Sequence, residues 1–221
     1  MRNLAQPKVL KLAGVAALVT TMASYPRLSL WLNRPGPMWY LETVIFFCSM
    51  VLWGFVFAWH TPYTRRPVFA LKIEPRWFII VTLIGIVATV ISRLWLDPWL
   101  RSKVPEDYPA DLTRWCAFVL FSMAFKQLFL LFAPFDWLMR LVKNRWMAVI
   151  LTVLFGVFVL AMRIRALPMP LPPLLLAALL AGRIVTGMLA VWFYLRGGVI
   201  LVWWWTLLSE ARLLFNLPDN H

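Results

Sequence analysis

Three ionisable residues stand inside long apolar stretches of this 221-residue chain: Lys126, Arg183 and Glu210. An unpaired charge at membrane depth costs several kcal/mol, so such residues commonly mark binding sites, proton paths or ion pairs. Gln127 adds a neutral polar side chain next to Lys126. We therefore treat these four residues as a candidate ligand-binding or buried polar cluster.

Helical spacing predicts that the three charges lie at one depth. With a rise of about 1.5 Å per residue, Lys126 would lie about 16 Å and Arg183 about 14 Å from the same side of the bilayer. Glu210 would lie about 18 Å from the opposite side of a core about 30 Å thick. We expect an Arg183–Glu210 ion pair with Lys126 close by. This pair could fix helix register, or form a net-positive cavity for a carboxylate, a phosphate or a lipid headgroup, unless one charge snorkels to the interface.

Composition indicates an integral membrane protein. Hydrophobic residues make up 62% of the chain and charged residues 14%, with a mean hydropathy of +0.78. Soluble domains are about half apolar and about a quarter charged. The formal charge of +13 comes from Lys and Arg between apolar segments, so we expect membrane lipids rather than nucleic acid as partners. Cys48 and Cys116 fit buried free thiols, and no metal or cofactor is expected.

The apolar segments predict an all-α bundle of about seven membrane helices, each near the ~20 residues that cross a bilayer. Their expected ranges are 9–25, 39–59, 77–96, 113–132, 146–162, 174–195 and 199–217. One transmembrane domain is expected over residues 1–221, with two N-terminal helices (1–65) and a helical core (66–217).

The connections between these helices are polar, basic or rich in proline. We expect a loop at 60–76 that includes His60, an acidic loop at 97–111 that ends at a helix N-cap, Asp111, and a polar corner at 133–140. Residues 167–173 contain four prolines and should be extended, and Gly197-Gly198 should form a turn. The Lys and Arg bias between loops predicts a cytoplasmic N-terminus, and the short loops fit a bacterial inner membrane.

The corner, the basic loop and the later glycine turn together form a recognisable layout. They read Phe135-Asp136-Trp137-Leu138-Met139-Arg140, Lys143-Asn144-Arg145-Trp146 and Phe193-Tyr194-Leu195-Arg196-Gly197-Gly198. From Arg66 onward the chain resembles the CPBP/Abi intramembrane family, which includes CAAX prenyl endopeptidases and bacteriocin-immunity proteins. Arg140 matches the family's Glu-Glu-x-x-x-Arg motif and Asp136 stands for its second glutamate, whereas Phe135 replaces the first.

Other motif positions of that family are lost. Met162 stands where the family carries the histidine of Phe-x-x-x-His, and Leu207 and Ala211 stand near its last His-x-x-x-Asn/Asp pair. The family's glutamates and histidines are thought to activate water for peptide hydrolysis, which needs a suitable base or metal-bound water. The resemblance therefore implies a degenerate, non-catalytic member. The remaining catalytic candidates are Asp136, Arg140 and Glu210.

Three functions are compatible with these features. The first is a non-catalytic scaffold, assembly factor or accessory subunit that binds another integral membrane protein, for which Trp203-Trp204-Trp205 would supply an outward-facing aromatic surface. The second is an intramembrane peptidase with an altered site around Asp136, Arg140, Lys126 and Glu210. The third is a transporter that handles lipids or small anions at the buried cluster. Enzymatic activity stays open, although the lost motif residues favour a protein without it.

Overall fold

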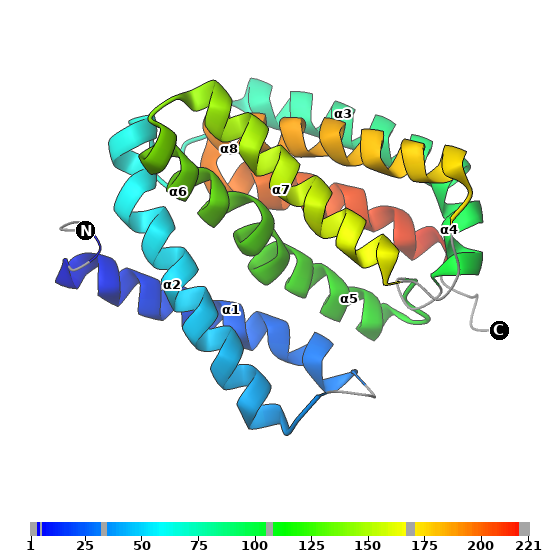
Figure 1. Ribbon diagram of the computed structural model, residues 1–221, viewed down its shortest axis with the longest axis horizontal. Coiled ribbons are helices and arrows are strands. Elements are labelled where there is room, and N and C mark those ends of the chain that lie inside the picture. Colours follow the sequence, from blue (N-terminus) through cyan, green and yellow to red (C-terminus); the bar gives the residue numbers. More distant parts are fainter. Residues whose placement is uncertain (1–3, 5, 32–34, 105–107, 167–170, 217–221) are drawn as a thin grey trace.

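The computed structural model describes residues 4, 6–31, 35–104, 108–166 and 171–216. Regular structure in these residues is helical, apart from an isolated β-bridge between Phe69 and Gly198 (Figure 1). Six helices among them are long and apolar enough to cross a membrane. The all-α membrane helix bundle expected from the sequence is therefore confirmed.

The helices follow the predicted order, and the first five segments, counted with the π-helical turns that join them, extend beyond their predicted bounds. The elements are α1 (Pro7–Ser29), α2 (Met38–Thr64), α3 (Pro75–Ile91), α4 (Asp97–Lys103), α5 (Leu112–Phe121), α6 (Ala133–Val142), α7 (Arg145–Arg165) and α8 (Pro173–Ala211). Short π-helical segments join some of them: η1 (Ser92–Leu96) links α3 to α4, and η3 (Ser122–Lys126) and η4 (Leu128–Phe132) link α5 to α6. A 3-10 turn, η5 (Arg212–Asn216), follows α8.

Side-chain caps fix the starts of two helices. Asp111 accepts a hydrogen bond from the backbone N–H of Arg114 at 2.7 Å, as the sequence predicted. Asn144 does the same for Trp146 and Met147 at the start of α7. Each cap satisfies donors that have no partner within the helix.

Three expected loops are wrong in whole or in part. The corner at 133–140 is helix α6, because Pro134 falls in its first turn, where a missing N–H is tolerated. Helix α2 continues to Thr64, so His60 is helical, and α4 occupies the start of the acidic loop. Residues 167–170 of the proline-rich stretch lie outside the described residues, and Pro173 begins α8.

Helix α8 is broken at the predicted glycine turn. Gly197 (φ −136°, ψ 17°) and Gly198 (φ 62°, ψ −155°) are not helical, and the chain reverses there (Figure 1). The rings of Phe193 and Trp205 therefore lie 5.3 Å apart. In a straight helix, twelve residues would separate them by about 18 Å. Only glycine fits at 198, since a Cβ would collide with the carbonyl oxygen of Val68.

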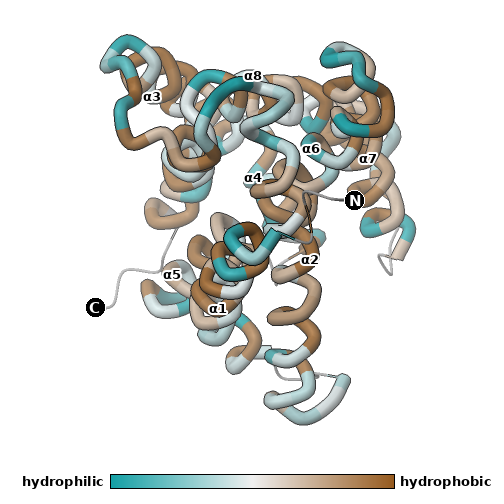
Figure 2. The backbone as a smooth tube through the Cα atoms, turned by 90° about the vertical axis from the view of Figure 1, so that its left-hand side faces the viewer, coloured by the Kyte–Doolittle hydropathy of each residue, from teal (hydrophilic) through white to brown (hydrophobic). Residues whose placement is uncertain are grey.

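The core and the surface are both largely apolar. Buried rings, including Phe132, Phe135, Phe193 and Tyr194, meet where α6 packs near α8. Figure 2 shows hydrophilic stretches at turns between helices and hydrophobic ones along their lengths. Cys48 and Cys116, which we expected to be buried, are exposed on helix surfaces. An apolar outer surface of this extent is typical of a protein whose solvent is lipid.

Candidate functional site

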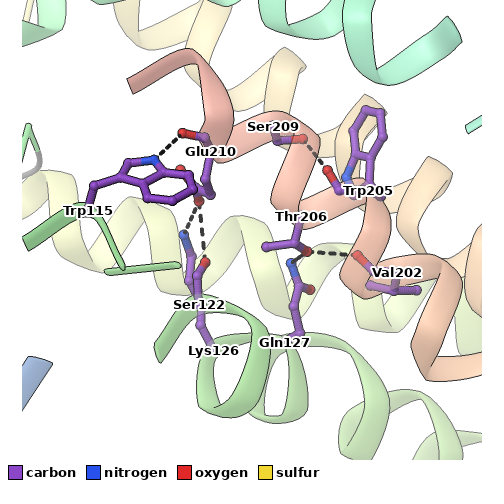
Figure 3. Close-up of polar contacts among 9 residues, drawn as sticks. All are labelled: Trp115, Ser122, Lys126, Gln127, Val202, Trp205, Thr206, Ser209 and Glu210. Carbon is purple, nitrogen blue, oxygen red and sulfur yellow. Dashed lines mark hydrogen bonds and ion pairs between the residues drawn. The ribbon is translucent and has the colours of Figure 1, made fainter. Parts of the chain in front are cut away.

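Two of the predicted cluster residues meet between η3 and α8. The Lys126 ammonium lies 3.8 Å from Oε1 of Glu210, and the Ser122 hydroxyl donates to the same oxygen at 3.3 Å (Figure 3). The Trp115 indole N–H donates to the backbone oxygen of Glu210 at 2.8 Å. The Glu210 side chain is 11% exposed and that of Lys126 is 41% exposed. Glu210 is thus held inside the bundle while Lys126 reaches the surface.

Gln127 contacts the same face of α8. Its amide donates to the Thr206 hydroxyl at 2.9 Å, and that hydroxyl donates to the backbone oxygen of Val202 (Figure 3). Thr206 and Glu210 are four residues apart and therefore share one helix face. Gln127 lies between the π-helical segments η3 and η4. Such segments are frequent at functional sites, which makes this seam a candidate for binding.

The expected Arg183–Glu210 ion pair is not formed. The guanidinium of Arg183 instead packs against Gly156 of α7, where an added Cβ would lie 3.0 Å from the Arg183 Nε. Arg183 and Gln127 border the same small cavity of about 20 Å³, enough for one water molecule. The first half of α8 packs on α7, with Gly187 against Val153, and this turns Arg183 away from Glu210.

A larger cavity lies beside the Lys126–Glu210 pair. We call it the amphipathic cavity; its volume is about 210 Å³. One part of its lining is polar and carries more cations than carboxylates: Lys126, Arg163, Arg212, Glu210 and Tyr108. The rest is apolar: Leu100, Val104, Phe118, Leu160, Ile164, Leu171, Leu179 and Leu213.

A buried carboxylate that the sequence analysis placed in a loop orders one wall of this cavity. Asp97 is 4% exposed and pairs with Arg212, while the Tyr108 hydroxyl donates to it at 2.9 Å. Asp97 directly continues the apolar run at 77–96, and this continuity was the available signal that it lies on a helix. The pairing aims Arg212 into the amphipathic cavity.

A second polar group lies among α2, α6 and α8. Nδ1 of His60 lies 3.1 Å from Oδ1 of Asp136, and the Tyr194 hydroxyl donates to Oδ2 at 2.7 Å. The His60 and Tyr194 rings lie 4.5 Å apart. His60 is 0% exposed and Asp136 is 1% exposed. Within the described residues, Nε2 of His60 has no hydrogen-bond partner.

Although the histidine positions of the family motifs are lost, Asp136 has a histidine partner, His60, from α2. His60 was missed because the predicted helix ended at Trp59, whereas α2 continues to Thr64. A carboxylate that orients an imidazole is a familiar catalytic arrangement, but a catalytic base must reach its substrate. Both side chains are enclosed, and neither lines the amphipathic cavity. The arrangement is therefore suited to joining three helices.

Arg140, one turn after Asp136, does not complete a catalytic set. Its guanidinium stacks over the Trp59 ring at 4.5 Å from the centroid. Such a cation–π contact holds the side chain against α2 without neutralising its charge. The three predicted catalytic candidates are consequently separated: Asp136 in the core, Arg140 on Trp59 and Glu210 beside Lys126.

The tryptophan triplet is directed inward, contrary to the expected outward aromatic surface. Trp203 donates to the backbone oxygen of Met123 at 2.8 Å, and Trp204 donates to the Thr82 hydroxyl at 2.9 Å. Trp205 is buried against Phe193. The second half of α8 lies between α3 and the α5–α6 helix, so each indole finds a partner inside the bundle.

No group of three or more His, Cys, Asp or Glu side chains in the described part of the chain is arranged to hold a metal ion. Comparison of the chain with protein-family models, with curated proteins and with solved structures finds no match.

Proposed function

We propose that this chain is a non-catalytic, multi-pass membrane protein that binds an anionic amphiphile in the amphipathic cavity. The observation that carries the proposal is the lining itself, in which Lys126, Arg163 and Arg212 face an apolar wall. A lipid with an anionic headgroup has the same division between charge and hydrocarbon. Binding sites of this kind combine a largely apolar lining with a few convergent polar groups.

The ion pair suggests how the ligand is held. Glu210 fixes the ammonium of Lys126 at the cavity, and Asp97 does the same for Arg212. An incoming anion would meet cations that are already positioned, which lowers the entropy lost on binding. A volume of about 210 Å³ lies below the ~300–1,000 Å³ of sites for drug-sized molecules, so a headgroup would enter while the acyl chains stay in the bilayer.

The test is the lipid that accompanies the purified protein. We expect the protein extracted in mild detergent to carry an anionic lipid, detected by native mass spectrometry, and Lys126→Met to lower its occupancy by about tenfold, the loss of one charge-assisted hydrogen bond. Lys11→Met is the matched control, because Lys11 is an exposed cation near the N-terminal end of α1. The C-terminal end of α1 is the one near the cavity, since Arg27 lies over Phe118. Equal lipid occupancy in Lys126→Met and the wild type would contradict the proposal.

A second candidate function is that of a scaffold or accessory subunit for another integral membrane protein. An apolar groove of about 430 Å³ between α2, α6 and α7 supports it, with Trp137 and Phe158 exposed along its wall. A photo-crosslinking amino acid at Trp137 should then capture one partner protein, whereas the same probe at the exposed Ile86 of α3 should not. Capture of lipid alone at position 137 would remove this candidate.

We also propose that the chain is a degenerate relative of the CPBP/Abi family. Arg140 at the end of α6, the basic α6–α7 loop and the Gly197-Gly198 reversal support this kinship. A retained peptidase activity would have to use Asp136 with His60, so Asp136→Asn should abolish cleavage of candidate peptides if the chain is an enzyme. Unchanged turnover in that variant would exclude this carboxylate from catalysis.

We propose that the chain crosses a bacterial inner membrane seven times, with its N-terminus in the cytoplasm. As one straight helix, the 39 residues of α8 would be about 58 Å long, roughly twice the thickness of a bilayer core. Its reversal at Gly197-Gly198 supports two crossings. A C-terminal alkaline phosphatase fusion should be active and a C-terminal green fluorescent protein fusion dark; the reverse result would refute this topology.

A further inference from the structure

Three arginines from different parts of the chain line one pocket at the end of the bundle where α2 ends and α7 begins. They are Arg66, Arg145 and Arg196, and the volume of this three-arginine pocket is about 150 Å³. Tyr63 and Thr64 add hydroxyl groups to its wall. Met139 and Leu195 complete the lining, and both are largely buried.

Two of the three guanidinium groups are held by neutral partners. Arg66 donates to the backbone oxygen of Arg196 at 2.8 Å, and Arg196 stacks over Trp77 at 4.6 Å from the ring centroid. A carbonyl and an indole orient these side chains without cancelling their charge. In the described part of the chain, none of the three pocket arginines lies within ion-pair distance of an acidic side chain, so the pocket keeps its positive charge.

The backbone around the pocket is also fixed. The N–H of Val199 donates to the oxygen of Val68 at 3.0 Å, which joins the segment after α2 to the reversal of α8. Gly198 allows this close approach. Arg66 and Arg196 thus lie on two segments that are pinned together, and the pocket needs little reorganisation to accept a ligand.

We propose that the three-arginine pocket binds a phosphate group, presented by an anionic lipid headgroup or by a free phosphate. The planar guanidinium fork matches phosphate oxygens in pairs, and the Tyr63 hydroxyl can donate to a further oxygen, whereas the Thr64 hydroxyl already donates to the backbone oxygen of His60 at 2.7 Å. A pocket of about 150 Å³ fits a single headgroup-sized anion. It lies at the ends of α2 and α6, both parts of membrane-spanning segments, which is the level of lipid phosphates.

This inference stands apart from the proposed function. The three-arginine pocket and the amphipathic cavity share no lining residue, and they lie toward opposite ends of the bundle. Lys126→Met tests the amphipathic cavity and leaves the three-arginine pocket intact. Because both sites would take an anionic lipid, the arginine variants are compared in the Lys126→Met background, and the two proposals can then fail separately.

The experiment uses the full-length protein in two arms. In the first, native mass spectrometry compares the binding of phosphatidic acid with that of phosphatidylcholine; in the second, calorimetry in detergent measures inorganic phosphate. Arg66→Gln, Arg145→Gln and Arg196→Gln should each weaken the bound species by about tenfold, the loss of one charge-assisted contact. Lys11→Gln is the control, because it removes one positive charge without touching the pocket. Lys11 lies at the same end of the bundle as the pocket, since Val9, two residues before it, packs on Trp59 near the end of α2.

Each outcome decides the proposal. Selective phosphatidic acid binding that the arginine variants lose identifies a lipid headgroup, and binding of inorganic phosphate alone identifies a soluble source. The proposal is overturned if neither ligand binds, or if Lys11→Gln weakens binding as much as the arginine variants do. Arg145→Gln keeps the test valid if the other variants unfold, since Arg145 is exposed and makes no ion pair in the described residues.

Discussion

Replacing Asp136 should reveal how much the buried group with His60 and Tyr194 stabilises the fold. Oδ1 of Asp136 lies 3.1 Å from Nδ1 of His60, and Oδ2 accepts a hydrogen bond from the Tyr194 hydroxyl at 2.7 Å. All three side chains are buried. Asp136→Asn can keep both contacts, because its amide oxygen accepts from Tyr194 and its NH₂ donates to the imidazole. Asp136→Leu, of similar size, keeps neither. Both variants remove the charge, so the difference between them reports the two hydrogen bonds together with the exchange of a buried amide for an apolar side chain.

The magnitude follows from two polar groups left without partners. Each orphaned buried group costs about 1–3 kcal/mol, so Asp136→Leu should be less stable than Asp136→Asn by about 2–6 kcal/mol. Removing the orphan hydroxyl should recover part of this loss. We therefore expect Asp136→Leu/Tyr194→Phe to be more stable than Asp136→Leu, although Tyr194→Phe alone lowers stability.

Unfolding in mixed micelles of dodecyl sulfate and a mild detergent, followed by tryptophan fluorescence, measures these free energies. Lys11→Leu, at an exposed position of α1, controls for a general effect of an added leucine. Equal stability of the Asn and Leu variants would refute the reasoning. So would additive effects of Asp136→Leu and Tyr194→Phe, because additivity would mean that the two side chains do not interact.

Three further predictions concern α8 and can be measured in the same unfolding assay. Gly198→Ala should cost several kcal/mol or prevent folding, because φ is +62° and the Cβ would meet Val68. Gly182→Ala is the control and should be neutral or stabilising, since nothing lies within 4 Å of its Cβ position; equal effects of the two substitutions would contradict the reasoning. Thr206→Val should lower the free energy of unfolding by about 1 kcal/mol, because it removes the hydroxyl that accepts a hydrogen bond from Gln127. An unchanged free energy of unfolding would show that this hydrogen bond does not stabilise the fold. Glu210→Gln should cost several kcal/mol, because it leaves the Lys126 ammonium without its carboxylate inside a membrane-spanning segment; a loss below about 1 kcal/mol would mean that water reaches the pair.

Much of the helical order could be predicted because length and apolar content alone define membrane segments. The Asp111 cap and the Gly197-Gly198 reversal depend on local chemistry, and the sequence located both. Lys126 was correctly expected near Glu210, since both stand inside apolar runs at similar depth. These features need no knowledge of which helix packs against which.

The wrong predictions concern side chains whose direction depends on how the helices pack against one another. Helix-face patterns separate core from water in soluble proteins, but lipid is as apolar as a protein core, so Trp203 and Trp204 gave no sign that they face inward. Arg183 was paired with the wrong helix for the same reason. His60 was lost because the apolar run stops at Trp59, and its partner Asp136 lies 76 positions further along the chain.

The second half of α8 has a consequence for biosynthesis. Its indoles bond to Met123 and Thr82, and Thr89 donates to the backbone oxygen of Leu208, so the neighbouring helices are tied to it. These residues leave the ribosome after the helices that surround them. Until then, the Thr89 hydroxyl and the other groups that this segment contacts lack these partners in the bilayer. A ribosome that stalls before this segment would release a bundle without its centre, a substrate for membrane proteases rather than a partly working protein.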